Sequence, residues 1–311
     1  MNGILPETFI KTITGIHGDK ASEWLENFEQ LIANCEKRYH LHIQEPFNLS
    51  YNFVAPAVRK DGKEVVVKIV LSIHQFETEL KALQLMASKS AVKVLEYEAE
   101  HGIMILERLY PGHTLAEVDD DEEAAQIAAN VMKELIVLAP LHSNLPTVVD
   151  RENSLKRIYR NHINGYGPIP KETIEEALHI FGRLNDSIKK QYLLHGDLHH
   201  YNILKNGESW VAIDPKGLIG DREYEVVQYL LNKLPENNVE EITEKRIDIF
   251  VEKLNLDKER VLLRAYSHAV LATCWTVEDG NYSENFFRTI QMFKNLCDTN
   301  NLRGTFKNWL S

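Results

Sequence analysis

The spacing of apolar residues changes once along this chain of 311 residues, and the change limits the possible folds more than any other feature. Between about residues 49 and 110 most apolar residues lie in short runs typical of strands, and from residue 121 they recur at helical spacing over long segments. A strand-like island at 191–214 interrupts the helical part. Since one core rarely organises so long a chain, we expect an α+β protein with a β-rich N-terminal lobe, 1–108, and a mainly helical C-terminal lobe, 109–311.

The same spacing predicts the individual elements. Strand-like runs lie at 49–58, 64–70, 92–100 and 102–109. Helices are expected at roughly 22–39, 75–88, 121–141, 150–163, 171–189, 221–233, 239–254, 257–277 and 281–299. Ser22 is the expected N-cap of the first helix, and Asp61-Gly62 between the first two strands is typical of a hairpin turn. A hinge is expected near residues 107–113, which contain a Tyr-Pro-Gly loop signal.

The charge balance argues against a nucleic-acid partner. The chain has 35 basic and 46 acidic residues and a net charge of −11, which weakens any approach to a phosphate backbone. Its start lacks the basic head and long apolar stretch of a signal peptide, and no run of about 18 apolar residues offers a membrane span. Cys35, Cys274 and Cys297 are far apart and form no CxxC pair. We therefore expect a cytoplasmic protein without disulfides.

The strand-like island contains the residues with the clearest chemistry. Asp197 is followed five residues later by Asn202, and Asp214 ends the strand VAID. Phosphoryl transfer requires an oriented hydroxyl and cations that bridge the β- and γ-phosphates. Asp197 is suited to accept the hydroxyl proton, while Asn202 and Asp214 offer the oxygen ligands that Mg²⁺ prefers. Such residues also cap turns, but three of them at this spacing match the kinase signature.

The motif HGDLHHYN, followed by AIDPKGLIGDREYEVVQYL, resembles the aminoglycoside phosphotransferase superfamily, and most closely its streptomycin and hydroxyurea phosphotransferase branch. The resemblance extends to NLSYNFVAPAVRKDGKEVVVKI and MILERLYPGHTL, so it covers most of the chain. It implies a two-lobed protein-kinase-like fold. Compared with the His-Arg-Asp motif of protein kinases, His195 and Asp197 are present and Gly196 replaces the arginine. His195 is expected to orient the catalytic loop by hydrogen bonding.

A strand lysine is the first candidate for nucleotide binding. In EVVVKIV, Lys68 is opposite in phase to Val65, Val67 and Ile69, as a lysine that reaches the α- and β-phosphates would be. The helix that follows contains Glu79 and Glu77, either of which could form the ion pair that orients the lysine. The family resemblance favours Glu79.

Two further segments are candidates for nucleotide contact. Residues 49–54 replace the Gly-rich loop of protein kinases without a single glycine. Ser50 and Asn52 could donate hydrogen bonds to the nucleotide there, although a plain hairpin is an equally good interpretation. At the hinge, the fold implies that the backbone from Glu107 to Leu109 meets the adenine edge.

The acceptor is expected to bind the C-terminal lobe. The family fold implies that Glu225, Glu278 and Asp279 lie with Asp197 around one cleft mouth, and Trp275 is close to the last two acids in the sequence. An aromatic ring beside acidic groups would suit a cationic sugar. A core tryptophan with solvated acids is the alternative.

Three other polar features have structural interpretations. Asp221 in IGDREYE is expected to cap the following helix and to brace the catalytic loop. The neighbours His199 and His200 have no HxxxH companion, so a zinc site is not expected. The acidic run 119–123 is expected to be the solvated start of a helix.

Together these features favour an ATP- or GTP-dependent small-molecule kinase that uses Mg²⁺. The resemblance implies an aminocyclitol such as streptomycin as the acceptor and antibiotic resistance as the role. Proteins of this fold also phosphorylate choline, methylthioribose and fructosamines, so another metabolite is an alternative acceptor. A non-catalytic nucleotide-binding module would be expected to lack Asp197 or Asp214, and both are present. A protein kinase is disfavoured because the Ala-Pro-Glu segment is missing.

Overall fold

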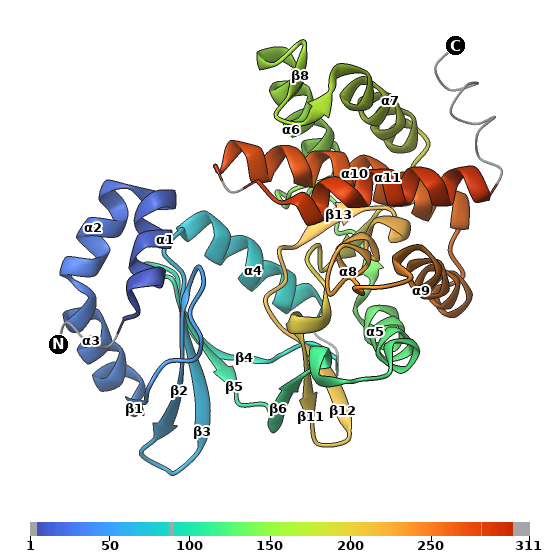
Figure 1. Cartoon of the computed structure of the whole chain (residues 1–311). Helices are drawn as coiled ribbons and strands as arrows, with labels where there is room; N and C mark the ends of the chain where they lie inside the picture. Colours follow the sequence, from blue (N-terminus) through green and yellow to red (C-terminus); the bar gives the residue numbers. More distant parts are fainter. Residues whose placement is uncertain (1–4, 87–89, 281, 301–311) are drawn as a thin grey trace. The chain divides into compact units, whose positions relative to one another are not determined.

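The computed structural model describes residues 5–86, 90–280 and 282–300, and the chain divides into two compact units (Figure 1). The first comprises Met1–Ala87 and Ala91–Gly112, and the second comprises Ser88–Ser90 and His113–Ser311. A β-sheet forms the centre of the first unit, and helices make up most of the second. The predicted α+β class is confirmed.

Five antiparallel strands form the sheet of the first unit, in the order β1-β2-β3-β5-β4. These are β1 Leu41–Ile43, β2 Phe53–Arg59, β3 Glu64–Ile69, β4 Val94–Glu98 and β5 Ile103–Glu107. The hairpin expected between β2 and β3 is present. Gly62 has a positive φ of 83°, and Oδ1 of Asp61 accepts a hydrogen bond from the N–H of Lys63 at 3.0 Å. The Asp-Gly pair therefore makes the turn for the reason that the sequence predicts.

Helices cover both faces of this sheet (Figure 1). They are α1 Glu7–His17, α2 Asp19–Glu26, α3 Phe28–Tyr39 and α4 Ile73–Met86. Helix α3 packs on the face that carries Val65, Val67 and Ile69. Because side chains alternate along a strand, Lys68 points to the opposite face, where α4 supplies Glu79 as its partner.

The first helices differ from the single helix predicted over 22–39. The chain forms α2 and α3, which meet at Asn27, and α1 precedes them without having been expected. Ser22 lies inside α2 instead of at an N-cap, so the predicted start was wrong. Nδ2 of Asn27 donates to the carbonyl of Glu23 at 2.9 Å, which helps to end α2.

An aromatic cluster spans the break between these helices. The ring of Trp24 on α2 lies 6.4 Å from that of Phe9 on α1 and 4.7 Å from that of Phe28 on α3, measured between centroids. Phe28 in turn lies 5.1 Å from Phe53 on the sheet. Rings from α1, α2, α3 and the sheet thus form one cluster, and the break at Asn27 lies between two of its members.

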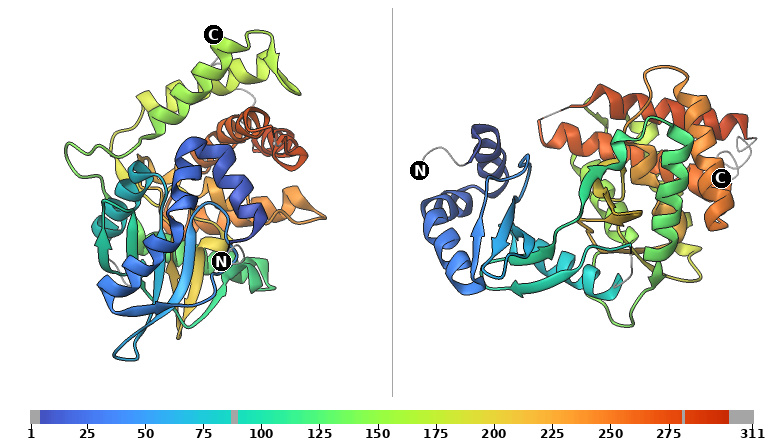
Figure 2. Two further views of the ribbon diagram at one scale, coloured as in Figure 1. Left: turned by 90° about the vertical axis from the view of Figure 1, so that its left-hand side faces the viewer. Right: turned by 90° about the horizontal axis from the view of Figure 1, so that it is seen from below.

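Helix α10 is the centre of the second unit. Residues 261–274 of this helix are all buried. It packs against α11 and α7, and Figures 1 and 2 show α10 and α11 side by side. Helix α5 packs against α9, and α6 against α7. The helices are α5 Asp121–Leu135, α6 Val148–Asn161, α7 Lys171–Asp186, α8 Val227–Leu230, α9 Val239–Leu254, α10 Lys258–Glu278 and α11 Glu284–Thr299.

Two predicted helical segments of this unit have informative outcomes. The segment 221–233 contains only the 3₁₀ turn Arg222–Tyr224 and the short α8. The acidic run does begin a helix: the Asp120 carboxylate accepts hydrogen bonds from the N–H groups of Glu122 and Glu123. Within residues 5–86, 90–280 and 282–300, no helix combines the length and apolar character needed to cross a membrane.

The strand-like island becomes two small β structures. Strand β10 lies between β7 and β13, antiparallel to both, and β11 pairs with β12 in a hairpin. The short strands are β6 Pro111–Thr114, β7 Val137–Leu138, β8 Gly165–Tyr166, β9 Ile169–Pro170, β10 Tyr192–Leu194, β11 Ile203–Asn206, β12 Ser209–Ala212 and β13 Leu218–Gly220. The loops after β10 and β12 contain the residues expected to be catalytic.

A buried ion-pair cluster joins the segment after β13 to α10. The carboxylate of Asp221 lies 2.7 Å from Nε of Arg260 and 2.9 Å from a terminal nitrogen of Arg264. Arg264 is fully buried and Asp221 is 5% exposed. The predicted cap was wrong: Asp221 occupies the N-cap position of the turn Arg222–Tyr224, but its carboxylate turns to α10.

Replacing Asp221 by alanine should destabilise the protein by about 3–5 kcal/mol, because the buried guanidinium of Arg264 would lose its counter-charge. Urea unfolding would measure the loss. The control is Glu241→Ala, which removes an exposed pair with Lys245 at 3.2 Å and should cost about 1 kcal/mol or less. Similar losses in the two variants would contradict a special role for the Asp221 pair.

Candidate active site

His195 holds the loop that follows β10. Its Nε2 donates to the carbonyl of Ile213 at 2.9 Å, and its Nδ1 accepts from the N–H of Asp197 at 3.3 Å. The side chain is 1% exposed, and burial lowers its pKa to about 3. The imidazole is therefore neutral, as one donor nitrogen and one acceptor nitrogen require.

Backbone bonds complete this clamp. The carbonyl of His195 accepts hydrogen bonds from the N–H of Lys216 at 2.8 Å and from the N–H of Gly217 at 3.2 Å. The side chain and the backbone of one residue thus tie the loop after β10 to the segment after β12. This brings Asp197 and Asp214 to the same place.

Gly196 occupies the position where protein kinases have arginine. Its φ is +79°, and a Cβ atom there would lie 2.8 Å from Cβ of Leu218 on β13. Both the backbone conformation and the close strand exclude a larger residue. The absence of the arginine is therefore a requirement of this loop.

Asp197 has the environment of a proton acceptor. Its side chain is 28% exposed, and burial raises its pKa to about 6. The charge of Asp214 raises the pKa further, while Lys216 and Arg151 lower it. Above about pH 6 the group is a carboxylate that binds a proton more readily than a fully solvated aspartate.

Asn202 and Asp214 present oxygen atoms from neighbouring segments. Nδ2 of Asn202 donates to the carbonyl of Asp197 at 2.9 Å and lies 3.3 Å from Nε2 of His199, so the amide nitrogen points into the loop. The N–H of Ile213 donates to the carbonyl of Asn202 at 2.9 Å, which ties this loop to the residue before Asp214. Asp214 has a positive φ of 61°, uncommon for a residue with a side chain. A carboxylate and an amide oxygen are a donor set that fits Mg²⁺.

Glu225 lies under the catalytic loop and not on an open surface. It is 2% exposed, and its carboxylate faces the backbone N–H groups of His195 and Gly196. Burial raises its pKa to about 8, although these N–H groups oppose the shift. Its position directly before Val226-Val227 is the signal in the sequence that the acid belongs to a buried face.

The other expected acceptor residues lie at the end of α10. The carboxylate of Glu278 binds the guanidinium of Arg157 with two contacts, at 2.6 and 2.9 Å, and this pairing lowers its pKa. Nε1 of Trp275 donates to Oγ of Ser154 at 3.0 Å. Asp279 is the exposed C-cap of the helix. The negative charge of Glu278 is thus matched by a cation that the sequence does not reveal.

Arg151 on α6 is a second cation near this region. Its guanidinium lies 5.4 Å from the ring centroid of Trp275, and its charge acts on both Asp197 and the buried His268. Nothing in the local sequence around Arg151 marks it as part of a site, since helical spacing says only that it is partly exposed.

The paired histidines have separate structural tasks. His199 is the N-cap of the turn His200–Asn202, and its Nδ1 accepts from the N–H of Tyr201 at 3.3 Å. His200 is fully buried and stacks on Tyr229 with ring centroids 3.9 Å apart. The two imidazoles therefore belong to different surroundings.

The first unit holds the expected ion pair. Nζ of Lys68 lies 2.6 Å from Oε1 of Glu79, and both residues are 5% exposed. The preference for Glu79 over Glu77 as the partner is confirmed. A buried lysine fixed in this way has a restricted orientation, which suits a residue that must meet a phosphate.

The remaining nucleotide candidates lie between the strands of this unit or at the end of one. Ser50 is exposed and Asn52 is half-buried, both between the antiparallel neighbours β1 and β2. Glu107 ends β5, and its Oε1 accepts from the N–H of Lys93 at 2.9 Å. Leu109 is buried. Their contacts with a nucleotide remain predictions.

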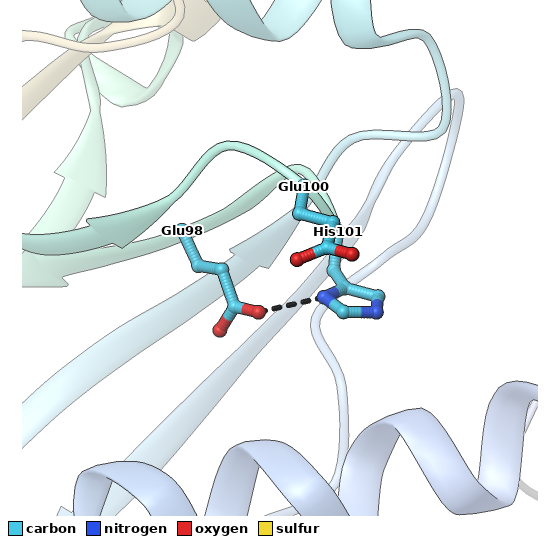
Figure 3. A group of neighbouring side chains, drawn as sticks. All are labelled: Glu98, Glu100 and His101. Carbon is cyan, nitrogen blue, oxygen red and sulfur yellow. Dashed lines mark hydrogen bonds and ion pairs between the residues drawn. The ribbon is translucent and has the colours of Figure 1, made fainter.

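A further group of metal-type ligands lies at the turn between β4 and β5 (Figure 3). Ligand atoms of Glu98, Glu100 and His101 lie within 4.8 Å of one another. Oε1 of Glu98 is 2.6 Å from Nδ1 of His101, and its other oxygen is 3.1 Å from Arg38. Because Arg38 and His101 already pair with Glu98, we interpret the group as a surface ion-pair cluster.

Comparison with known proteins finds relatives over most of the chain. The model of a family described as aminoglycoside/hydroxyurea antibiotic resistance kinase matches residues 42–280. Streptomycin 6-kinase of Streptomyces griseus is 25% identical over 295 residues, which cover 89% of this chain and 92% of that protein. Hydroxyurea phosphotransferase of Kitasatospora aureofaciens is 27% identical over 297 residues, which cover 89% of this chain and 81% of that protein.

A solved structure has the same fold. A thermostable aminoglycoside phosphotransferase in ternary complex with ADP and hygromycin B matches with a TM-score of 0.59 at 14% identity, covering 87% of this chain and 97% of that chain. The fold and the relatives define a protein-kinase-like phosphotransferase that acts on small molecules. Within that class, the chain belongs to the aminoglycoside/hydroxyurea antibiotic resistance kinase family.

Gly196→Ala should destabilise the protein more than a glycine replacement without a close neighbour. The left-handed backbone costs about 1–2 kcal/mol for a residue with a side chain, and the contact with Leu218 adds to it. The matched control is Gly207→Ala, where φ is +58° and the space around the new Cβ is open. Denaturant unfolding would compare the two, and equal losses would show that Leu218 does not restrict the loop.

Proposed function

We propose that this kinase transfers the γ-phosphate of ATP, or of GTP, to a hydroxyl of an aminocyclitol of the streptomycin type. The observation that carries the proposal is the convergence of Asp197, Asn202 and Asp214 on one loop pair held by His195. The streptomycin 6-kinases among the relatives support the acceptor class.

Asp197 is the proposed base. The proton of the acceptor hydroxyl moves to its carboxylate, the hydroxyl oxygen forms a bond to the γ-phosphorus, and the bond from that phosphorus to the bridging oxygen breaks. The bonding electrons leave with the nucleoside diphosphate. The pKa of about 6 supports this role, since a base is most effective when its pKa is near the working pH.

Asn202 and Asp214 are the proposed ligands of Mg²⁺. When bound, the ion neutralises the charge that develops on the phosphate oxygens. Asp214 contributes the charged ligand, and Asn202 a neutral oxygen directed by the bonds of its own amide nitrogen.

In the first unit, Lys68 is proposed to contact the α- and β-phosphates while Glu79 holds it in position. Ser50, Asn52 and the backbone from Glu107 to Leu109 are the other proposed nucleotide contacts. The solved relative with bound ADP supports nucleotide use by this fold.

For a cationic acceptor, Trp275, Glu278 and Asp279 remain the proposed contacts, and Asp279 is the exposed acid at the end of α10. A neutral acceptor such as hydroxyurea is a second candidate. It is favoured by Arg151, whose positive charge acts on Asp197, and by the pairing of Glu278 with Arg157. Glu225, buried under the loop, is then proposed to support the acceptor side only through the loop.

A panel of acceptors would test the function. With ATP and Mg²⁺, streptomycin should be converted to a product heavier by one phosphoryl group, which mass spectrometry would detect, and hydroxyurea and choline are the comparison acceptors.

Asp197→Ala should lower kcat by about 10²-fold or more, since general base catalysis contributes that much, while nucleotide binding persists. Steady-state kinetics would measure kcat, and calorimetry would measure nucleotide binding. Unchanged kcat in the folded variant would remove Asp197 from the mechanism.

Asp214→Ala should affect binding where Asp197→Ala affects chemistry. Without the carboxylate, the amide of Asn202 is a neutral and weaker ligand, so productive binding of the Mg²⁺–nucleotide should be lost. Excess Mg²⁺ should restore little activity. A variant with ordinary activity and Mg²⁺ dependence would show that the metal binds elsewhere.

A further inference from the structure

Lys216 places a third charged group between the two catalytic carboxylates. Its Nζ lies 3.3 Å from Oδ2 of Asp214 and 3.9 Å from Oδ2 of Asp197. The residue lies two positions after Asp214, and neither the protein-kinase comparison nor the predicted metal site gives it a task.

The backbone fixes the base of this side chain while the ammonium stays accessible. The N–H of Lys216 donates to the carbonyl of His195 at 2.8 Å, so the residue shares the clamp that positions Asp197. Its side chain is 46% exposed, compared with 6% for Lys68. A lysine anchored by its backbone and open at its end can exchange a carboxylate partner for a ligand.

The chemistry of the site determines which ligand atoms would meet this ammonium. In the proposed reaction the acceptor oxygen lies at Asp197 and the cation at Asp214, so the phosphoryl group in transfer lies between them. Its three equatorial oxygens carry the charge of the transition state. An ammonium between the two carboxylates is therefore directed at those oxygens.

We propose that Lys216 is a catalytic residue that binds the γ-phosphoryl group of the nucleotide and stabilises it during transfer. The proposal rests on the proposed kinase function. Lys216 takes no proton and forms no covalent bond, so the bonds made and broken are those given above. It supplies the charge and hydrogen-bond donors that protein kinases and nucleotide hydrolases obtain from other cationic groups.

Two simpler roles make different predictions. If Lys216 only balances the two carboxylates, its removal should leave nucleotide affinity unchanged or should strengthen Mg²⁺ binding, because a competing cation is lost. If it only supports the metal site, its removal should weaken every Mg²⁺–nucleotide complex alike. Only a contact with the γ-phosphoryl group would make the loss of Lys216 weaken binding of a nucleoside triphosphate and not of a nucleoside diphosphate.

Calorimetry with two probes, AMP-PNP and ADP, each with Mg²⁺, would test the proposal on the full chain. Lys216→Met keeps the length of the side chain and removes its charge. It should weaken AMP-PNP binding by about 10- to 100-fold, the range expected for the loss of a hydrogen bond to a charged group, and leave ADP binding unchanged. kcat should also fall, by about 10²-fold or more, as for the loss of one oxyanion donor.

Lys190→Met is the matched control, because Lys190 is exposed just before β10 and its Nζ lies 5.5 Å from the ring centroid of Tyr192. It should bind both probes as the original protein does. Lys216→Arg should keep more of the AMP-PNP affinity than Lys216→Met, because it keeps the positive charge. Unchanged thermal unfolding of the Lys216 variants would show that the fold is intact.

Equal changes for AMP-PNP and ADP, or no change for either, would overturn the role of Lys216 while leaving the kinase function in place. Failure of the original protein to bind AMP-PNP at all would overturn both. A selective loss of AMP-PNP binding would support both, since neither of the simpler roles predicts it.

Discussion

The active-site loops depend on one neutral, buried histidine. His195 binds the segment after β12 with its imidazole and, through its own carbonyl, the N–H groups of Lys216 and Gly217. The two hydrogen bonds of the imidazole require one protonated and one unprotonated nitrogen. Burial lowers the pKa of His195 and so keeps the ring in this uncharged form. The positions of Asp197 and Asp214 relative to each other follow from this clamp.

Two buried acids, Glu225 and Asp221, lie next to the segments that His195 holds together. Glu225 faces the N–H groups at the start of the loop. Asp221, four residues before Glu225, pairs with two arginines of α10. Buried charges are costly unless they are paired, so the loop, the turn after β13 and α10 are held to a narrow set of arrangements. The fold thus gives rigidity to the loops that contain Asp197 and Asp214, while Glu278 and Asp279 at the end of α10 are exposed to solvent.

The architecture followed from local patterns wherever one element could be recognised by itself. Alternation in EVVVKIV predicted β3 and the direction of Lys68, and Asp61-Gly62 predicted the hairpin. The break at Asn27 and the helix α1 could not be predicted in this way. Residues 22–39 keep helical spacing across Asn27, and the contacts of Trp24 with Phe9 and Phe28 join separate helices, whereas helical spacing reports only on neighbours a few residues away.

For the site, the sequence by itself determined which residue types stand at the ends of β10 and β12, because the spacing from Asp197 to Asn202 and Asp214 is a property of one short segment. It also indicated an ion pair between Lys68 and an acid of the next helix, Glu79 or Glu77, and the structure has Glu79 as the partner. Only the tertiary structure decided that Arg157 binds Glu278 across 121 residues of sequence and that Glu225 is buried under the loop. The physical reason is that charge pairing and burial depend on which helices pack together, and no local pattern records a partner from another helix.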